Sequence, residues 1–159
     1  MNPDYLAYEK ERDAIREINK LHLAGFEIWL KNSGLSEKTI ERHVSNVDFY
    51  INEFLCYYDA EEVVAGCYRV GMFLGSWFIR KAPSSLSGIR SNAASFKKFY
   101  AYMTAVNVIK QKDYDFLCKT IKEEMPEWLD AMRSYDEMLD RLHRDEVNNF
   151  IASYFEFKT

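Results

Sequence analysis

The middle of the chain combines basic and hydroxyl side chains with a complete absence of carboxylates. Residues 63–112 contain eight Lys or Arg residues and no Asp or Glu, whereas residues 1–62 and 113–159 are both acidic. Arginine and lysine bind phosphate oxygens, and serine hydroxyls and the first N–H groups of a helix also donate hydrogen bonds to phosphate. This composition therefore indicates a surface that contacts a polyanion such as DNA.

The stretch SSLSGIRSNAASFKKFYAYM, residues 84–103, places such side chains on one side of a helix predicted over about Leu86–Ala105. At 100° per residue its apolar side chains gather on one face, and the small and basic residues gather on the other. The small and basic face carries Ser87, Arg90, Ser91, Ala94, Lys97, Lys98 and Ala101. Small side chains permit close approach and long cations reach past them, so this face suits the major groove of DNA.

Further cations are expected beside this helix. Arg80 and Lys81 precede it, and Lys38 and Arg42 lie one turn apart on the polar side of an earlier helix. If both helix starts lie at one end of a bundle, these residues form a single basic rim. The acidic flanks oppose the approach of DNA, and lysines are also common on any solvated helix face.

These residues need an all-α fold to position them. Six glycines and three prolines among 159 residues favour helices over a turn-rich sheet protein, and the length fits one domain, residues 1–159. We expect a helix from about Tyr5 to Asn32, a second from Ser36 to about Tyr57, a third from the Asp59/Glu62 capping pair to about Arg80, a fourth over Leu86–Ala105, a fifth from near Asp113 that bends or restarts at Pro126, and a last short helix over Glu146–Phe155.

Other kinds of chemistry have little support in the sequence. The histidines His22, His43 and His143 are far apart and lack the spacing of metal ligands, and no glycine-rich phosphate loop is present. We therefore expect no catalytic residue, metal, cofactor or small-molecule substrate. The apolar run Val63–Ile79 is too short and too interrupted to span a membrane, and three cysteines favour a reduced, cytoplasmic setting.

Two segments resemble a known family when they are read in order. LSEKTIERHVSNVDFYINEFL, residues 35–55, is similar to the opening of the core-binding domain of tyrosine recombinases, the phage-integrase type. SSLSGIRSNAASFKKFYAYMTAVNVI, residues 84–109, is similar to a later helix of the same domain. The resemblance covers about residues 7–121 and leaves residues 122–159 as an acidic helical extension.

The resemblance implies a SAM-like four-helix bundle, preceded by a long N-terminal helix and followed by additional C-terminal helices. Such a domain clamps one side of double-stranded DNA, with its second and fourth helices at the major groove. The positions of this chain that match the family's contacts are Lys38, Thr39, Arg42, Ser85, Ser87, Arg90, Ser91 and Lys97.

The chain departs from the family in one important respect. Tyrosine recombinases cut DNA with a separate C-terminal domain, which contributes a His-x-x-Arg motif and a tyrosine nucleophile among other residues. Only 47 residues follow Lys112, and His143 is followed three positions later by Glu146 instead of arginine. We therefore expect no strand cleavage, and no enzyme activity, from this chain.

The sequence thus predicts a non-catalytic DNA-binding domain with an accessory role in DNA recombination or integration. One alternative is a helical module that binds a protein partner or itself, because its acidic ends and basic middle could pair between chains. Another alternative is the front part of a longer recombinase.

Overall fold

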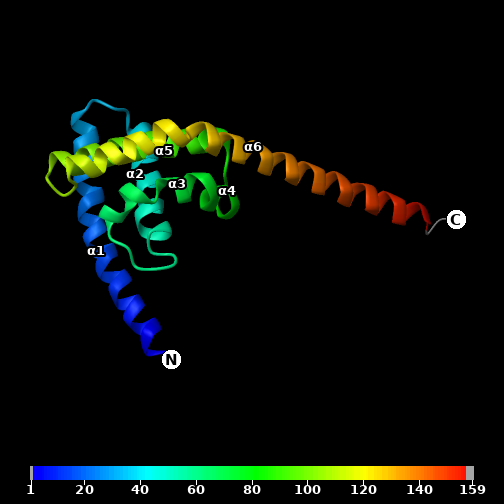
Figure 1. The fold of residues 1–159 in the computed structure, drawn as a ribbon, viewed down its shortest axis with the longest axis horizontal. Helices are drawn as coiled ribbons and strands as arrows, with labels where there is room; N and C mark the ends of the chain where they lie inside the picture. The colour runs from blue at the N-terminus through cyan, green and yellow to red at the C-terminus, as the bar shows by residue number, and fades with distance from the viewer. Residues whose placement is uncertain (1, 157–159) are drawn as a thin grey trace.

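The computed structural model describes residues 2–156, and every regular element in that range is helical (Figure 1). The expected all-α fold is therefore confirmed. In chain order the elements are α1 (Pro3–Asn32), α2 (Glu37–Asp48), η1 (Phe49–Phe54), η2 (Val63–Tyr68), α3 (Val70–Met72), η3 (Phe73–Trp77), α4 (Phe78–Lys81), α5 (Leu86–Ala105) and α6 (Gln111–Glu156).

The ends of the longer helices follow local sequence signals. Gly34 has φ +78° just after α1, a conformation that costs glycine little because it has no Cβ. Ser36 Oγ accepts a hydrogen bond from the Thr39 N–H at 3.3 Å and starts α2. Ser85 Oγ accepts one from the Gly88 N–H at 2.9 Å and starts α5. A capping serine thus stabilises the first turn of each of the two helices that carry the predicted interface.

The segment between residues 63 and 81 differs from the single helix that the sequence predicts. It consists of a 3₁₀ turn (η2), a short α-helix (α3), a π-helical turn (η3) and a last α-helical turn (α4). The predicted capping pair is wrong, because η2 begins after Glu62 with no side-chain cap. The segment lies in the core, since Phe73 and Leu74 are fully buried.

Aromatic packing joins the two π-helical turns, η1 and η3. The ring of Phe54 lies 4.9 Å from that of Phe73 and 5.4 Å from that of Trp77, measured between ring centroids. Phe49 contacts the same two rings. Because a π-turn is wider than an α-turn, it offers bulky rings a different spacing along the helix. The two irregular turns therefore meet in one aromatic cluster.

Two buried tyrosines fix the 3₁₀ turn to the core. Tyr50 stacks on Phe96 with a centroid separation of 4.2 Å, and its hydroxyl donates a hydrogen bond to the Gly66 carbonyl at 2.6 Å. The Tyr100 hydroxyl donates to the Val63 carbonyl at 2.7 Å. Burial raises the pKa of both phenols well above their ordinary value, so both hydroxyls remain protonated donors.

Helix α6 is a single helix of 46 residues that leaves the body of the protein (Figure 1). Of the two possibilities predicted at Pro126, a bend or a restart, the restart does not occur, and the separate last helix predicted over 146–155 is wrong. Proline removes the hydrogen bond to the carbonyl four residues earlier, which here belongs to Lys122. Both residues are exposed, so water can solvate that carbonyl while the helix continues.

The first half of α6 belongs to the core. Leu117, Ile121, Trp128 and Met132 are buried against the body, so the boundary expected between residues 121 and 122 falls inside one packed helix. Beyond Tyr135 every described residue is exposed. Within residues 2–156 we find no helix with the length and apolar character that crossing a membrane requires.

The contact between Gly66 and the buried tyrosines gives a test of the core. A Cβ at Gly66 would overlap the Tyr100 hydroxyl and lie 3.1 Å from Tyr50 Cε1, so we expect Gly66→Ala to destabilise the protein by about 1–3 kcal/mol through overpacking. Urea unfolding followed by circular dichroism measures this cost. Tyr100→Phe removes the overlapping atom, so the same Gly66→Ala change should cost less in that background. An equal cost in both backgrounds would contradict the packing described here.

Candidate nucleic-acid interface

A groove lies between α2 and the first half of α5. Arg42 enters it from α2, and all the other residues that line it come from α5 or its N-cap. Its volume is ≈ 620 Å³, and it is lined by Arg42, Ser85, Ser87, Gly88, Arg90, Ser91 and Ala94. The structure therefore brings together the central residues of the two sequence motifs, and we call this feature the α2–α5 groove.

A polar cluster below the groove holds α2 against α5. Ser95 Oγ, which is buried, donates a hydrogen bond to the Ser91 carbonyl at 3.0 Å. Since a hydroxyl has one proton, its oxygen accepts from its other partners: Asn46 Nδ2 at 3.0 Å and His43 Nδ1 at 2.8 Å. Asn46 also donates to Ser91 Oγ at 3.1 Å. These four residues, the Ser95 cluster, fix the register of the two helices.

The predicted interface cations of α2 and α5 form no ion pair with a carboxylate in residues 2–156. The ion pairs of this range use Arg12, Arg16, Lys20, Lys31, Arg69 and Arg133. None of them involves the predicted interface cations Lys38, Arg42, Arg90, Lys97 and Lys98, of which all but the half-buried Lys98 are exposed. Their charge is therefore available to an external anion.

The acidic residues of α2 lie away from the groove. Glu37, Glu41 and Asp48 line a different hollow together with Glu27 of α1. Helix α2 thus presents carboxylates on its α1 side and a cation, Arg42, on its α5 side. This segregation keeps the groove positive although the whole chain carries a net charge of −4.

The pKa of His43 reflects the charges of cations from both helices. Burial lowers the pKa of His43, and the charges of Arg42 and Lys98 lower it further. Arg42 comes from α2 and Lys98 from α5, so cations of both helices act on the same imidazole. A positive field of this kind favours the binding of an anion.

Two predicted site residues lie elsewhere. Arg80 donates a hydrogen bond to Ser76 Oγ at 3.0 Å and lines a hollow beside α6. Lys81 donates to the Tyr57 hydroxyl at 2.8 Å, and its Nζ lies 4.3 Å from the centre of that ring. Neither cation lines the α2–α5 groove, and Lys38, Lys97 and Lys98 also lie outside its lining. Arg80 and Lys81 have other partners, so the single rim expected from the sequence is smaller than predicted.

The hydroxyl residues of the predicted site are placed in two ways. Ser85 and Ser87 line the groove, with their Oγ atoms 3.2 Å apart. Thr39 instead accepts a hydrogen bond from Ser36 at 2.9 Å and belongs to the capping turn of α2. The sequence analysis did not identify Asn46 and Ser95 as residues that join α2 to α5. A signal was present, because Asn46 lies four residues after the predicted contact Arg42 and Ser95 lies four residues after the predicted contact Ser91. Residues four apart lie on the same helix face.

The described residues offer little for metal or thiol chemistry. Within residues 2–156, no three or more His, Cys, Asp or Glu side chains come together in a way that could hold a metal ion. Burial raises the pKa of the Cys67 thiol to about 12 and also raises that of Cys56. Both thiols are therefore protonated at neutral pH and behave as small apolar core groups.

Comparison with known proteins gives no match to any protein-family profile, curated protein or solved structure. The functional assignment of the α2–α5 groove therefore depends on its own geometry and charge.

The buried His43 gives a prediction about pH. Its pKa is lower in the folded protein than the ordinary value of about 6.5, so the unfolded chain binds the proton more strongly. Its contribution to stability is complete above about pH 6.5 and is lost as the pH falls through the lower, folded-state pKa. We expect His43→Gln to reduce the loss of unfolding free energy between about pH 7 and pH 5, measured by urea unfolding.

His22→Gln is the matched control for this experiment, because burial also lowers the pKa of His22 but no cation of the groove acts on it. The His43 change should alter the pH dependence more than the His22 change. The same pH dependence in His43→Gln and the wild type would show that His43 is not held neutral.

Proposed function

We propose that this protein is a non-catalytic DNA-binding domain whose α2–α5 groove contacts the phosphate backbone of double-stranded DNA. One observation carries the proposal: Arg42 of α2 and Arg90 of α5 line one groove, and no carboxylate of residues 2–156 forms an ion pair with them. Lys38 of α2 and Lys97 and Lys98 of α5 lie outside the groove lining and likewise form no ion pair in that range, so the proposed interface has five cations.

The groove combines several kinds of phosphate donor. Arg42 and Arg90 line it from two helices, and a guanidinium can bind two phosphate oxygens at once. Ser85 and Ser87 add hydroxyls at the start of α5, where the helix dipole is positive. Gly88 and Ala94 have almost no side chain, so a DNA backbone can come close to α5.

Within the proposed interface, the outer face of α5 is best suited to contact the DNA bases. An α-helix fits the width of the major groove, while neighbouring elements contact the flanking phosphates. Arg90 and Lys97 lie seven residues, about two turns, apart on the exposed side of α5. We place α5 in the major groove, with Lys38 and Arg42 of α2 on the adjacent backbone.

The resemblance to the core-binding domain of tyrosine recombinases supports the same arrangement. The two similar segments correspond to α2 with η1 and to α5, and the Ser95 cluster joins these helices directly. A SAM-like bundle that holds one side of DNA is therefore part of the proposal. Its role would be accessory to DNA recombination or integration, with strand cleavage supplied by another protein.

The proposal predicts binding that weakens with salt. If all five cations contact phosphates, the logarithm of the binding constant should fall against the logarithm of the salt concentration with a slope of about −4 to −5. Fluorescence anisotropy with a labelled duplex of about 30 base pairs measures the slope. A slope near zero would show that the groove does not bind phosphates.

Charge reversal on α5 identifies the binding face. We expect Arg90→Glu with Lys97→Glu to lower duplex affinity at least about 100-fold, because two phosphate contacts become repulsive. The control is Lys10→Glu with Lys20→Glu on α1, which makes the same change in net charge at two exposed positions. Both double variants should unfold at the same urea concentration as the wild type.

The comparison separates a local contact from a general effect of charge. Equal losses in the α5 and α1 variants would indicate that only net charge matters. Unchanged binding in the α5 variant would exclude the face assigned here.

A further inference from the structure

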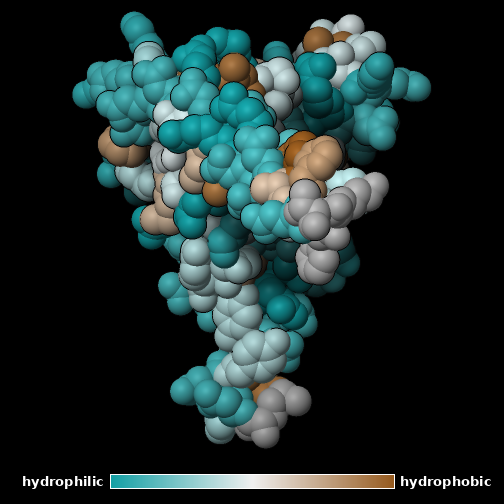
Figure 2. All heavy atoms as spheres, turned by 90° about the vertical axis from the view of Figure 1, so that its right-hand side faces the viewer, coloured by the Kyte–Doolittle hydropathy of each residue, from teal (hydrophilic) through white to brown (hydrophobic). Residues whose placement is uncertain are grey.

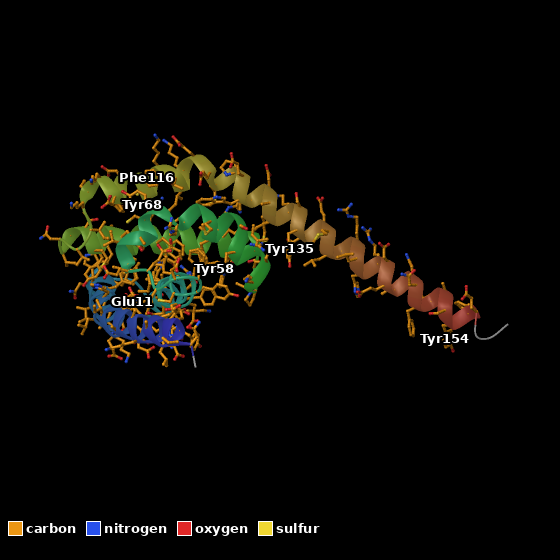
Figure 3. The ribbon with its side chains drawn as sticks, turned by 60° about the horizontal axis from the view of Figure 1, so that its bottom comes forward. Glu11, Tyr58, Tyr68, Phe116, Tyr135 and Tyr154 are labelled. Carbon is orange, nitrogen blue, oxygen red and sulfur yellow. The ribbon has the colours of Figure 1, made fainter. Side chains whose placement is uncertain are left out.

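The second half of α6 leaves a long apolar surface uncovered. We call residues 133–156 of this helix the arm. Tyr135 lies where α6 leaves the body and Tyr154 lies near the far end (Figure 3). From residue 136 to residue 156 every side chain is exposed. The large apolar ones are Met138, Leu139, Leu142, Val147, Phe150, Ile151, Tyr154 and Phe155.

The uncovered surface is costly for a helix in water. Phe150 is 70% exposed and Leu142 is 52% exposed, and apolar side chains are visible beside the grey chain end at the tip of the arm (Figure 2). In proteins most helical stability comes from tertiary packing of an apolar face, whereas every described residue of the arm beyond Tyr135 is exposed. Its apolar side chains therefore indicate a partner that covers them.

The order of residues in the arm is approximately symmetric about its midpoint between Arg144 and Asp145. Starting from the midpoint and moving outward, residues at equal distances on the two sides have related character. The pairs of apolar or aromatic residues are Leu142 with Val147, Leu139 with Phe150, Met138 with Ile151, and Tyr135 with Tyr154; His143 falls opposite Glu146, and Phe155 falls opposite Ser134, which breaks the pattern. An antiparallel isologous dimer uses this pattern, because a twofold axis perpendicular to the helices places each position at the level of its counterpart in the other copy.

Helical geometry selects one face for the contact. Leu139, His143, Glu146 and Phe150 follow each other at spacings of four, three and four residues, which is the spacing of the contact line in a coiled coil. Leu142 and Val147 lie on the two edges of this line. We call the line and its edges the arm face.

We propose that the arm face binds the arm of a second copy of this chain, with the two helices antiparallel. In this register Leu139 of each copy contacts Phe150 of the other, and His143 contacts Glu146 of the other. The overlap extends along the arm from residue 133 to residue 156, and its end next to the body includes Tyr135, which packs partly against the core.

The charges on the arm face select the antiparallel orientation. In a parallel pair in register, Glu146 would face Glu146 and His143 would face His143. In the antiparallel pair each carboxylate meets an imidazole, and a polar layer of this kind inside an apolar line sets orientation and register in coiled coils. This proposal does not depend on DNA binding, because the arm and the α2–α5 groove share no residue.

Sedimentation equilibrium of the full chain over about 1–100 μM tests the proposal. We expect a reversible monomer–dimer equilibrium in this range, and Phe150→Asp should weaken it at least about tenfold by placing a charge in the apolar layer. Circular dichroism and urea unfolding check that the body of each variant is folded. A wild-type chain that stays monomeric at 100 μM would overturn the proposal.

A charge exchange tests the orientation. His143→Glu places two carboxylates together in each of the two polar layers, so we expect the dimer dissociation constant to rise at least about tenfold. Adding Glu146→Lys to that variant restores opposite charges across both layers and should bring the constant back to within about threefold of the wild type. Failure of the second change to rescue the first would exclude the antiparallel register.

Two further variants distinguish pairing between arms from other modes of association. Asn148→Glu makes the same formal change in charge as His143→Glu, but it lies on the opposite side of the helix, so it should leave the dimer unchanged. Arg90→Glu with Lys97→Glu should also leave it unchanged. If that double variant dissociates the dimer, the acidic arm binds the basic groove of another copy, and pairing between arms is wrong.

Discussion

The hydroxyl of Ser95 is the contact on which the candidate interface depends. It is buried between α2 and α5 and makes hydrogen bonds to the Ser91 carbonyl, to Asn46 and to His43. Buried polar groups without partners cost about 1–3 kcal/mol each, so the two helices are favoured in the one register that satisfies all of them. That register places Arg42 and Arg90 on the same groove.

The distribution of acidic residues matters as much as that of the basic ones. Most of the cations on α1 are paired with a carboxylate, as Lys20 is with Glu17 and Lys31 with Glu27. Around the groove, residues 2–156 contain no such pair. In a salt bridge the positive and negative charges lie close together and largely cancel at a distance. The paired cations therefore contribute little to the electric field outside the protein. An acidic chain can therefore carry a positive surface.

The sequence predicted what depends on short-range signals and missed what depends on packing. The end of the first helix at Asn32, the start of the second at Ser36 and the bounds of the helix over Leu86–Ala105 were predicted correctly, because each depends on signals a few residues away. The π-helical turns were not predictable from propensity, since they form where several aromatic rings meet. Lys81 was misplaced because its alternative partner, Tyr57, is distant in sequence. The continuity of α6 through Pro126 was also missed, because core contacts on both sides hold the helix together.

The position of Pro126 gives the long C-terminal helix a built-in point of weakness. About 30 residues follow it, and at 1.5 Å per residue they form a lever about 45 Å long. A change of about 10° in curvature at the proline would sweep the far end through about 8 Å, and prolines commonly produce larger kinks than this. Because Trp128 and Met132, which follow the proline, are buried against the body, core packing fixes the curvature at Pro126 and with it the direction in which the distal end points.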